Sequence, residues 1–119
     1  MDLYARTEVK IGPHRVEMIP LNVALKIPED CWVMVAARGS THKLGIMMAN
    51  GIGIGDWDYR GDNDEYLFPA LNFTDHEVVV ERGARIAQMM VCRMERVELV
   101  EVEETGEADR GGFGSTGKR

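Results

Sequence analysis

The sequence predicts an all-β domain of the sandwich or barrel class. Short apolar runs of strand length recur along the 119 residues, and turn-forming residues separate many of them. Only residues 81–94 are compatible with a helix, and the Arg82-Gly83 pair near their start argues against one. Several short strands at this spacing are typical of a sandwich or barrel.

Eight segments carry the strand prediction, because each has strand length and a composition rich in β-forming residues. In chain order they are residues 7–11, 14–21, 31–37, 45–49, 66–73, 77–81, 86–94 and 97–102. The turn signals between them are Gly12-Pro13, Pro28-Glu29-Asp30, residues 51–55, Gly61-Asp62-Asn63-Asp64 and Arg82-Gly83. Residues 95–103, around the last segment, alternate apolar and acidic residues over their second half, as a half-buried or edge strand does. We therefore expect a single all-β domain over residues 1–103 and a flexible Gly-rich arm over residues 104–119.

The composition restricts the class of function. Twenty Asp and Glu against fourteen Lys and Arg give a net charge of −6, which argues against broad binding to nucleic acid or to acidic membranes. No run approaches the roughly 18 apolar residues of a membrane span and no secretion signal is evident, so we expect a cytoplasmic protein. Cys31 and Cys92 lie apart in apolar runs, which indicates reduced core thiols and neither a disulfide nor a zinc site. A polyanionic ligand would need a local site and a divalent cation to offset the charge.

Five short polar segments interrupt the strands. They are Asp2-Leu3-Tyr4-Ala5, Arg38-Gly39-Ser40-Thr41, residues 50–61, Arg85-Ile86-Ala87-Gln88 and the chain end from Arg110. Taken singly, most have an ordinary structural explanation, such as a turn or a solvated strand end. The alternating glycines of 50–61 suggest close backbone approach, with a plain wide hairpin as the alternative. The glycine-rich end suits a phosphate chain and a stacked base, although a disordered tail is the commoner explanation of such a composition.

Read together and in order, these segments resemble the five motifs of the homotrimeric dUTP pyrophosphatases (dUTPases). The matching patterns are D-L-x-A, R-G-S-T, N-x-x-G-x-x-D-x-D-Y-R-G, G-x-R-I-A-Q and R-G-G-F-G-S-T-G. They cover essentially the whole chain, and details between them are similar to the branch found in bacilli and their phages. The resemblance implies a jelly-roll-like β fold, a homotrimer with active sites at subunit interfaces, and a C-terminal arm that closes over another subunit's site.

The resemblance also implies a reaction, the hydrolysis of dUTP to dUMP and pyrophosphate with Mg²⁺. By motif position Asp56 is the general base that activates the attacking water, because a carboxylate held close to a water can take its proton. Asp2 matches the position associated with the hydrated metal ion. The positions that match phosphate-binding residues are Arg38, Ser40 and Gln88 in the body and Arg110, Gly114, Ser115 and Thr116 in the arm. Arg85 is expected to be structural.

Selection of uracil needs different groups. Asn50 and the backbone of the hairpin around Gly53 can pair with the edge of uracil and reject cytosine, because cytosine would leave buried polar groups unpaired. Thymine differs from uracil by one methyl group and must be excluded sterically. The alternating glycines let the backbone of the hairpin approach closely enough to leave no room for that methyl group. Tyr59 matches the residue that packs under the deoxyribose and excludes a 2′-hydroxyl, and Phe113 would stack on the base when the arm closes.

Three features depart from the family pattern. Gly39 replaces a serine, Gly55 replaces Ile or Val before the general base, and the strand that usually precedes the first motif is not present. A dCTP deaminase, which shares the fold, would need a Glu in residues 67–72, and none is there. The main alternative is a dUTPase-like nucleotide-binding or regulatory protein with weak or no catalysis, engaging a regulatory protein partner if the chain is phage-derived.

Overall fold

The computed structural model describes residues 1–114, and its regular structure is β-strand apart from one short 3₁₀ helix. The strands are β1 Asp2–Tyr4, β2 Val9–Ile11, β3 Val16–Pro20, β4 Cys31–Ala37, β5 Ile46–Met48, β6 Gly53–Gly55, β7 Leu67–Asn72, β8 Val78–Val80 and β9 Arg85–Arg93, with the 3₁₀ helix η1 at Thr41–Leu44. No helix among the described residues is long and apolar enough to cross a membrane.

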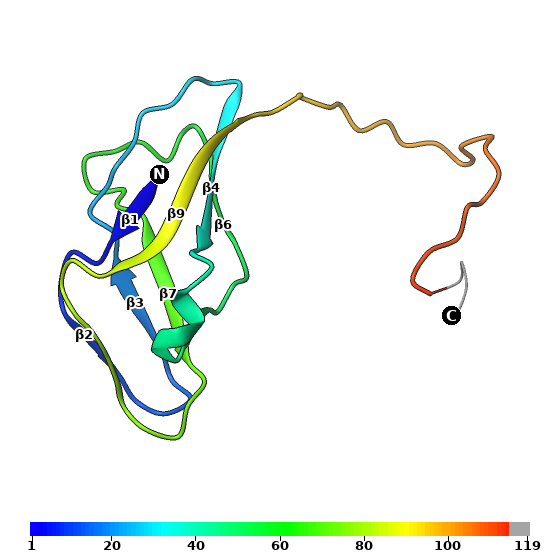
Figure 1. Cartoon of the computed structure of the whole chain (residues 1–119). Helices are drawn as coiled ribbons and strands as arrows, with labels where there is room; N and C mark the ends of the chain where they lie inside the picture. The colour runs from blue at the N-terminus through cyan, green and yellow to red at the C-terminus, as the bar shows by residue number, and fades with distance from the viewer. Residues whose placement is uncertain (115–119) are drawn as a thin grey trace.

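The strands form three antiparallel sheets (Figure 1). The largest has the order β1-β9-β4-β6, the second β3-β7-β5, and the third pairs β2 with β8. The longest pairing joins β4 to β9, from Cys31 opposite Arg93 to Ala37 opposite Ala87. Among the described residues β6 pairs only with β4, so its other edge is open.

The core lies between these sheets and is made by alternate residues of the strands. Val33 and Val35 of β4 and Phe68 and Ala70 of β7 are all buried, whereas the residues between them are more exposed. Burying an aliphatic or aromatic side chain of this size contributes roughly 1.5–3 kcal/mol. Residues 23–27 extend the core from an irregular segment, where Val23, Leu25 and Ile27 are partly buried against it.

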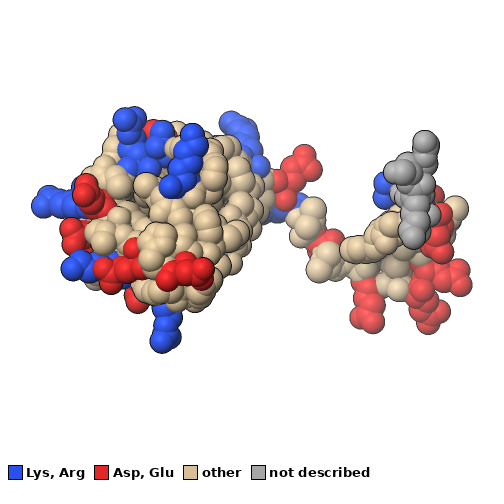
Figure 2. Space-filling view, turned by 60° about the horizontal axis from the view of Figure 1, so that its bottom comes forward, with Lys and Arg blue, Asp and Glu red and all other residues tan. Residues whose placement is uncertain are grey.

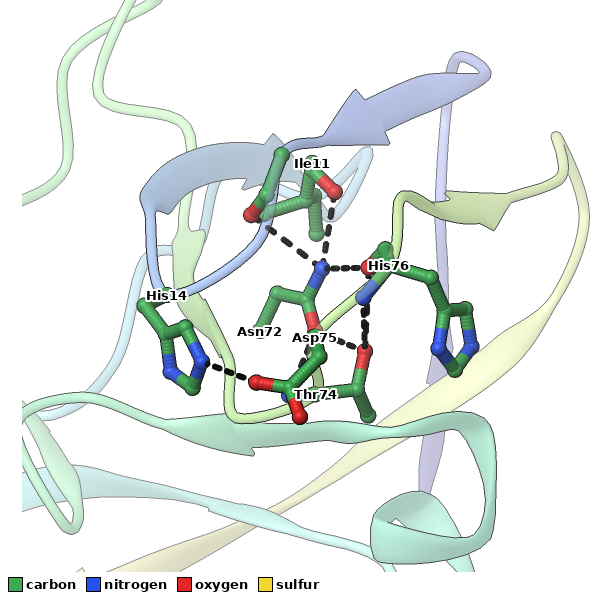
Figure 3. Close-up of polar contacts among 7 residues, drawn as sticks. Ile11, His14, Asn72, Thr74, Asp75 and His76 are labelled. Atoms are coloured by element: carbon green, nitrogen blue, oxygen red, sulfur yellow. Dashed lines mark hydrogen bonds and ion pairs between the residues drawn. The ribbon is translucent and has the colours of Figure 1, made fainter.

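A fully buried asparagine, Asn72, joins two turns at one end of the body (Figure 3). Its Nδ2 lies within hydrogen-bond distance of the carbonyls of Ile11, Gly12 and His76, at 2.9, 3.1 and 2.7 Å. Its Oδ1 accepts from the backbone and hydroxyl of Thr74 at 2.9 and 2.7 Å. Because all its polar atoms are paired, burial of this amide is tolerated, and it fixes the β7–β8 turn to the β2–β3 turn.

Seven of the eight predicted strands are confirmed, each with its ends moved by no more than about two residues. The eighth prediction, at residues 97–102, is wrong, because residues 94–114 form no strand and Leu99 is 94% exposed. A strand needs a hydrogen-bonded neighbour, and the described chain offers this segment none. Sequence reasoning missed β1 and β6, which have three residues each. Both cysteines are free as predicted, Cys31 buried and Cys92 only half-buried.

After β9 the chain leaves the body as an extended arm (Figure 1). Among the described residues, which end at 114, the last hydrogen bonds of the arm to the body run from Met94 N to the Asp30 carbonyl and from the Arg96 guanidinium to Glu29. The radius of gyration is 18.7 Å, against about 13.5 Å expected for a compact domain of this length, and the arm accounts for the difference. Acidic side chains gather on the arm, whereas the body carries both signs of charge (Figure 2).

Candidate active site

A pocket of about 210 Å³ opens beside β6 and gathers three predicted substrate-binding residues, Asn50, Gly53 and Tyr59. Its remaining lining residues are Val35, Ile54, Gly55, Tyr66 and Leu67. Two larger hollows, of about 290 and 380 Å³, lie around Arg6 and Asn22 and contain none of the predicted site residues. The pocket beside β6 is therefore the candidate base site, and its size suits a group smaller than a drug-sized ligand.

A tight turn places Asn50 at the mouth of this pocket. Gly51 N donates to the Met48 carbonyl at 3.0 Å, and Gly51 has a φ of +77°, which favours glycine. Ile52 N donates to the Asn50 carbonyl at 2.9 Å, and the chain then enters β6. The Asn50 side-chain amide has no hydrogen-bond partner among residues 1–114 and is exposed, so it is available to a ligand.

Asp56 follows directly after β6, next to the pocket residue Gly55, and is not itself one of the lining residues. Its carbonyl accepts from Tyr59 N at 3.1 Å, which makes residues 56–59 a turn. Its carboxylate is exposed and has no hydrogen-bond or ion-pair partner within the described chain. An unpaired, exposed carboxylate beside a pocket residue can hold and polarise a water.

Two tyrosines form one wall of the pocket. The rings of Tyr59 and Tyr66 meet edge to face, with centroids 5.3 Å apart and an interplanar angle of 88°. The Tyr59 hydroxyl donates to the Glu65 carbonyl at 2.7 Å, and the Tyr59 side chain remains partly accessible. Burial, followed by the proximity of Tyr59 and Asp56, raises the pKa of the Tyr66 phenol. Tyr66 is a pocket residue that sequence reasoning missed; its only signal was an aromatic residue at the start of a predicted strand.

A second group of predicted residues lies at the β1–β9–β4 end of the large sheet. The strand register puts Asp2 opposite Gln88, and Gln88 opposite Ala36. The Asp2 carboxylate lies 3.6 Å from Arg38 Nε and 3.7 Å from Arg85 Nη1, so it is shared by two guanidinium groups. Two positive charges against one negative charge leave this group able to hold an anion.

Backbone bonds fix these side chains in place. Arg38 Nη1 donates to the Arg85 carbonyl at 3.1 Å, and Gln88 Nε2 donates to the Ala37 carbonyl at 3.1 Å. The buried Thr41 hydroxyl accepts from Arg38 N at 2.9 Å and donates to the Ile86 carbonyl at 2.6 Å. Thr41 thus joins the loop after β4 to β9, a role whose only signal in the sequence was the Arg-Gly-Ser-Thr pattern. The contact of Arg85 with Asp2 agrees with the structural role expected for Arg85.

Ser40 lies at the start of η1 with its side chain exposed and free of a capping hydrogen bond. The adjacent Gly39 is exposed as well, and a Cβ added to it would meet no atom within 4 Å. The loop that carries both residues is therefore open to a ligand approaching Arg38.

Of the arm residues predicted to bind substrate, the structure describes Arg110, Phe113 and Gly114, and none of them lies at either group. Arg110 Nη1 donates to the Gly111 carbonyl at 3.3 Å, and the Phe113 side chain is fully exposed. Phe113 and Gly114 have φ of +50° and +86°. Ser115 and Thr116 lie outside the described residues. Within residues 1–114, no side-chain hydrogen bond or ion pair joins the pocket residues Asn50 and Tyr59 to Asp2, Arg38 or Gln88.

Comparison with known proteins identifies the family of this chain. The dUTPase family model matches residues 1–117. The chain is 39% identical over 121 residues to a SPbeta prophage-derived deoxyuridine 5′-triphosphate nucleotidohydrolase of Bacillus subtilis, covering 100% of this chain and 84% of that one. It is 38% identical over 122 residues to the deoxyuridine 5′-triphosphate nucleotidohydrolase of Neorickettsia sennetsu, covering 98% of this chain and 80% of the other.

Solved structures share the fold. The dUTPase of Staphylococcus bacteriophage 80alpha with dUPNHPP superposes with a TM-score of 0.84 at 22% identity, covering 98% of this chain and 85% of that one. The dUTPase of Streptococcus mutans gives a TM-score of 0.77 at 23% identity, covering 82% and 79%. The jelly-roll-like all-β prediction is confirmed, with open sheets in place of a closed barrel. With a family model matched along almost its whole length, the chain belongs to the dUTPase family.

Proposed function

We propose that this protein hydrolyses dUTP to dUMP and pyrophosphate, with Asp56 as the general base. Membership of the dUTPase family, and relatives named as deoxyuridine 5′-triphosphate nucleotidohydrolases, support the reaction. The observation that carries the assignment is the free Asp56 carboxylate, one residue after Gly55 in the hairpin whose Asn50, Gly53 and Gly55 line the pocket with Tyr59.

Base recognition would use the open edge of β6 together with the Asn50 amide. An edge strand presents backbone N–H and C=O groups, which suit the acceptor–donor–acceptor edge of uracil. Gly53 lies close to β4, the neighbouring strand of the same sheet, since a Cβ on Gly53 would be 3.4 Å from the Val35 Cβ. This packing leaves the Gly53 backbone as the pocket wall that meets the base.

The phosphates would bind at Arg38, Ser40 and Gln88, with Arg110, Gly114, Ser115 and Thr116 brought in by the arm. Asp56 would take the proton of the water that attacks the α-phosphorus, and Phe113 would cover the base. Closing an arm over the site excludes water and strengthens each charged contact.

Mg²⁺ fits this proposal as a partner of the nucleotide. No group of three or more His, Cys, Asp or Glu side chains lies together in the described part of the chain, so the protein alone offers no cage for the ion. Mg²⁺ is commonly held by one or two carboxylates together with substrate phosphates, and Asp2 supplies one such carboxylate, acting through water. The bound ion would neutralise phosphate charge. A structure of the dUTPase from phage phi11 of S. aureus is described as showing coordination of a structural Mg(II) ion.

A homotrimer would complete the site. Within the described residues, no side-chain hydrogen bond or ion pair joins Asn50 and Tyr59 of the base pocket to the Asp2–Arg38–Gln88 group, and the Phe113 side chain on the arm is fully exposed. The arm exposes Val97, Leu99, Val100 and Val102, which need a second copy for burial. Light scattering after size exclusion tests this assembly, and a monomer at micromolar concentration would contradict it. The flexible arm beyond residue 103 and the cytoplasmic location remain predictions.

Pyrophosphate release with Mg²⁺ tests the function, run on dUTP beside dTTP, dCTP and UTP. We expect rapid release from dUTP alone. Absence of release from all four nucleotides, in a protein that still binds dUTP, would favour the alternative of a nucleotide-binding or regulatory protein with a protein partner.

A further inference from the structure

A bidentate ion pair lies behind the pocket wall. Arg6, in the loop between β1 and β2, donates from Nε to Glu65 Oε2 at 2.8 Å and from Nη2 to Glu65 Oε1 at 3.0 Å. This parallel fork is the strongest geometry that an Arg and a carboxylate can adopt, and it fixes direction as well as distance. The Glu65 side chain is 26% exposed and the Arg6 side chain 47%, so solvent reaches the pair mainly from the Arg6 side.

A second element holds the same carboxylate. Asn22 N donates to Glu65 Oε2 at 2.8 Å. The next residue is fixed to the same segment, because Tyr66 N donates to the Val23 carbonyl at 3.0 Å and the Tyr66 carbonyl accepts from Leu21 N at 2.9 Å. Glu65 is therefore anchored on two sides to parts of the chain that lie far from it in sequence.

The backbone of Glu65 in turn holds Tyr59. The Tyr59 hydroxyl donates to the Glu65 carbonyl at 2.7 Å, across a loop whose tip is exposed. The bond of Gly61 N to Asp64 Oδ2, at 2.9 Å, is internal to that loop and does not fix the loop to the body. The hydrogen bond to the Glu65 carbonyl and the edge-to-face contact with the Tyr66 ring thus set the position of the Tyr59 ring.

We propose that the Arg6–Glu65 pair is a positioning element for sugar selection. It holds the Glu65 carbonyl, and through that carbonyl the Tyr59 ring, at the wall that meets the deoxyribose. The inference rests on the proposed function, in which Tyr59 excludes a 2′-hydroxyl. Loosening the pair lets the ring move away and opens room for ribose, so acceptance of UTP rises relative to dUTP.

The test is steady-state hydrolysis of dUTP and UTP by the full chain with Glu65→Gln or Arg6→Lys. Each variant keeps the size of the side chain and breaks the bidentate fork. We expect the ratio of kcat/KM for dUTP to that for UTP to fall about tenfold, the value of one charge-assisted hydrogen bond. The control is Asp75→Asn, which breaks an exposed ion pair of 2.8 Å with His14 at the other end of the body and should leave the ratio unchanged.

A double-mutant cycle with Tyr59→Phe separates positioning from general destabilisation. Phenylalanine cannot bond to the Glu65 carbonyl, so Glu65→Gln should change the ratio no further in that background. Equal effects of Glu65→Gln with and without the Tyr59 hydroxyl would overturn the inference, as would an unchanged ratio in both single variants. Failure of the proposed function is a different result, since the unmodified protein would then not hydrolyse dUTP.

Discussion

The side chain of Tyr66 occupies the space that a side chain at position 55 would fill. A Cβ built on Gly55 would overlap the Tyr66 hydroxyl and lie 2.6 Å from two carbons of its ring. Gly55 departs from the Ile or Val expected before the general base, and the structure gives the reason: Tyr66, the residue just before β7, fills the volume. The pocket wall beside Asp56 is thus built by a long-range pair of residues.

Gly55→Ala should therefore destabilise the fold and disturb Asp56 at the same time. We expect a loss of about 1–3 kcal/mol in the free energy of unfolding, the usual cost of overpacking, and a lower kcat on dUTP. Chemical denaturation and steady-state kinetics measure the two effects. Gly39→Ala is the matched control, because a Cβ at Gly39 meets no atom within 4 Å. Equal stability of the two variants would contradict the close contact.

Asp56→Asn should abolish turnover while dUTP binding stays within roughly tenfold of the unmodified protein. The amide keeps the shape of the side chain and cannot take a proton, so the loss should appear in kcat. Single-turnover kinetics and calorimetric titration with dUTP measure these separately. Turnover at the unmodified rate would show that another group activates the water.

The strands that the sequence predicted well are those whose pattern is decided by burial alone. Residues 31–37 coincide with β4, in which buried residues alternate with more exposed ones across the sheet. β6 was missed because two of its three residues are glycines, which have poor strand propensity, and only pairing with β4 makes them a strand. Residues 97–102 show the opposite error, since their alternation is real and no partner for it lies in the described chain.

The candidate site divides in the same way. Asn50, Gly53 and Asp56 are close in sequence, so one hairpin brings them together, and their motif was readable. Tyr66 and Glu65 act through contacts with Gly55 and Arg6, and no local pattern predicts a contact between residues 11 or 59 positions apart. The roles assigned to the individual residues remain predictions.

Gly39→Ser should be tolerated by the fold and should improve catalysis. Space is free around residue 39, and its φ is not in the left-handed region, so a serine fits there. A hydroxyl beside Arg38 adds a hydrogen bond to a phosphate oxygen, worth about 1.5 kcal/mol or more, which is a rise in kcat/KM for dUTP of on the order of tenfold. Gly39→Ala controls for the loss of glycine. If Gly39→Ser and Gly39→Ala have equal kcat/KM for dUTP, the phosphates do not bind beside residue 39.

The Arg6–Glu65 pair should contribute stability only above a defined pH. The hydrogen bond from Arg6, followed by that from Asn22 N and the Arg6 charge, outweighs burial and lowers the pKa of Glu65 below its ordinary 4.5. A lowered pKa in the folded state gives a contribution that is fully present above about pH 4.5 and is lost as the pH falls through the lowered value. Thermal unfolding from pH 6 to pH 3 should thus show a smaller decrease in Tm for Glu65→Gln than for the unmodified protein. Parallel curves would contradict this linkage.

Deletion of the chain from Arg110 onward should abolish most activity and leave the β core intact. The arm beyond Arg96 makes no hydrogen bond to the body among the described residues, so its loss removes no contact from the core. The reduction in kcat/KM for dUTP should exceed that of Phe113→Ala, for which loss of a stacked base costs about 1–3 kcal/mol, or roughly five- to 150-fold.

Phe113→Trp keeps an aromatic face and should retain most of the activity that Phe113→Ala loses. For the deletion and the two Phe113 variants, calorimetric Tm values measure the stability of the fold and pyrophosphate release measures the activity. A fall in Tm on deletion would make the arm a structural element, and full activity without it would remove Arg110 and Phe113 from the site.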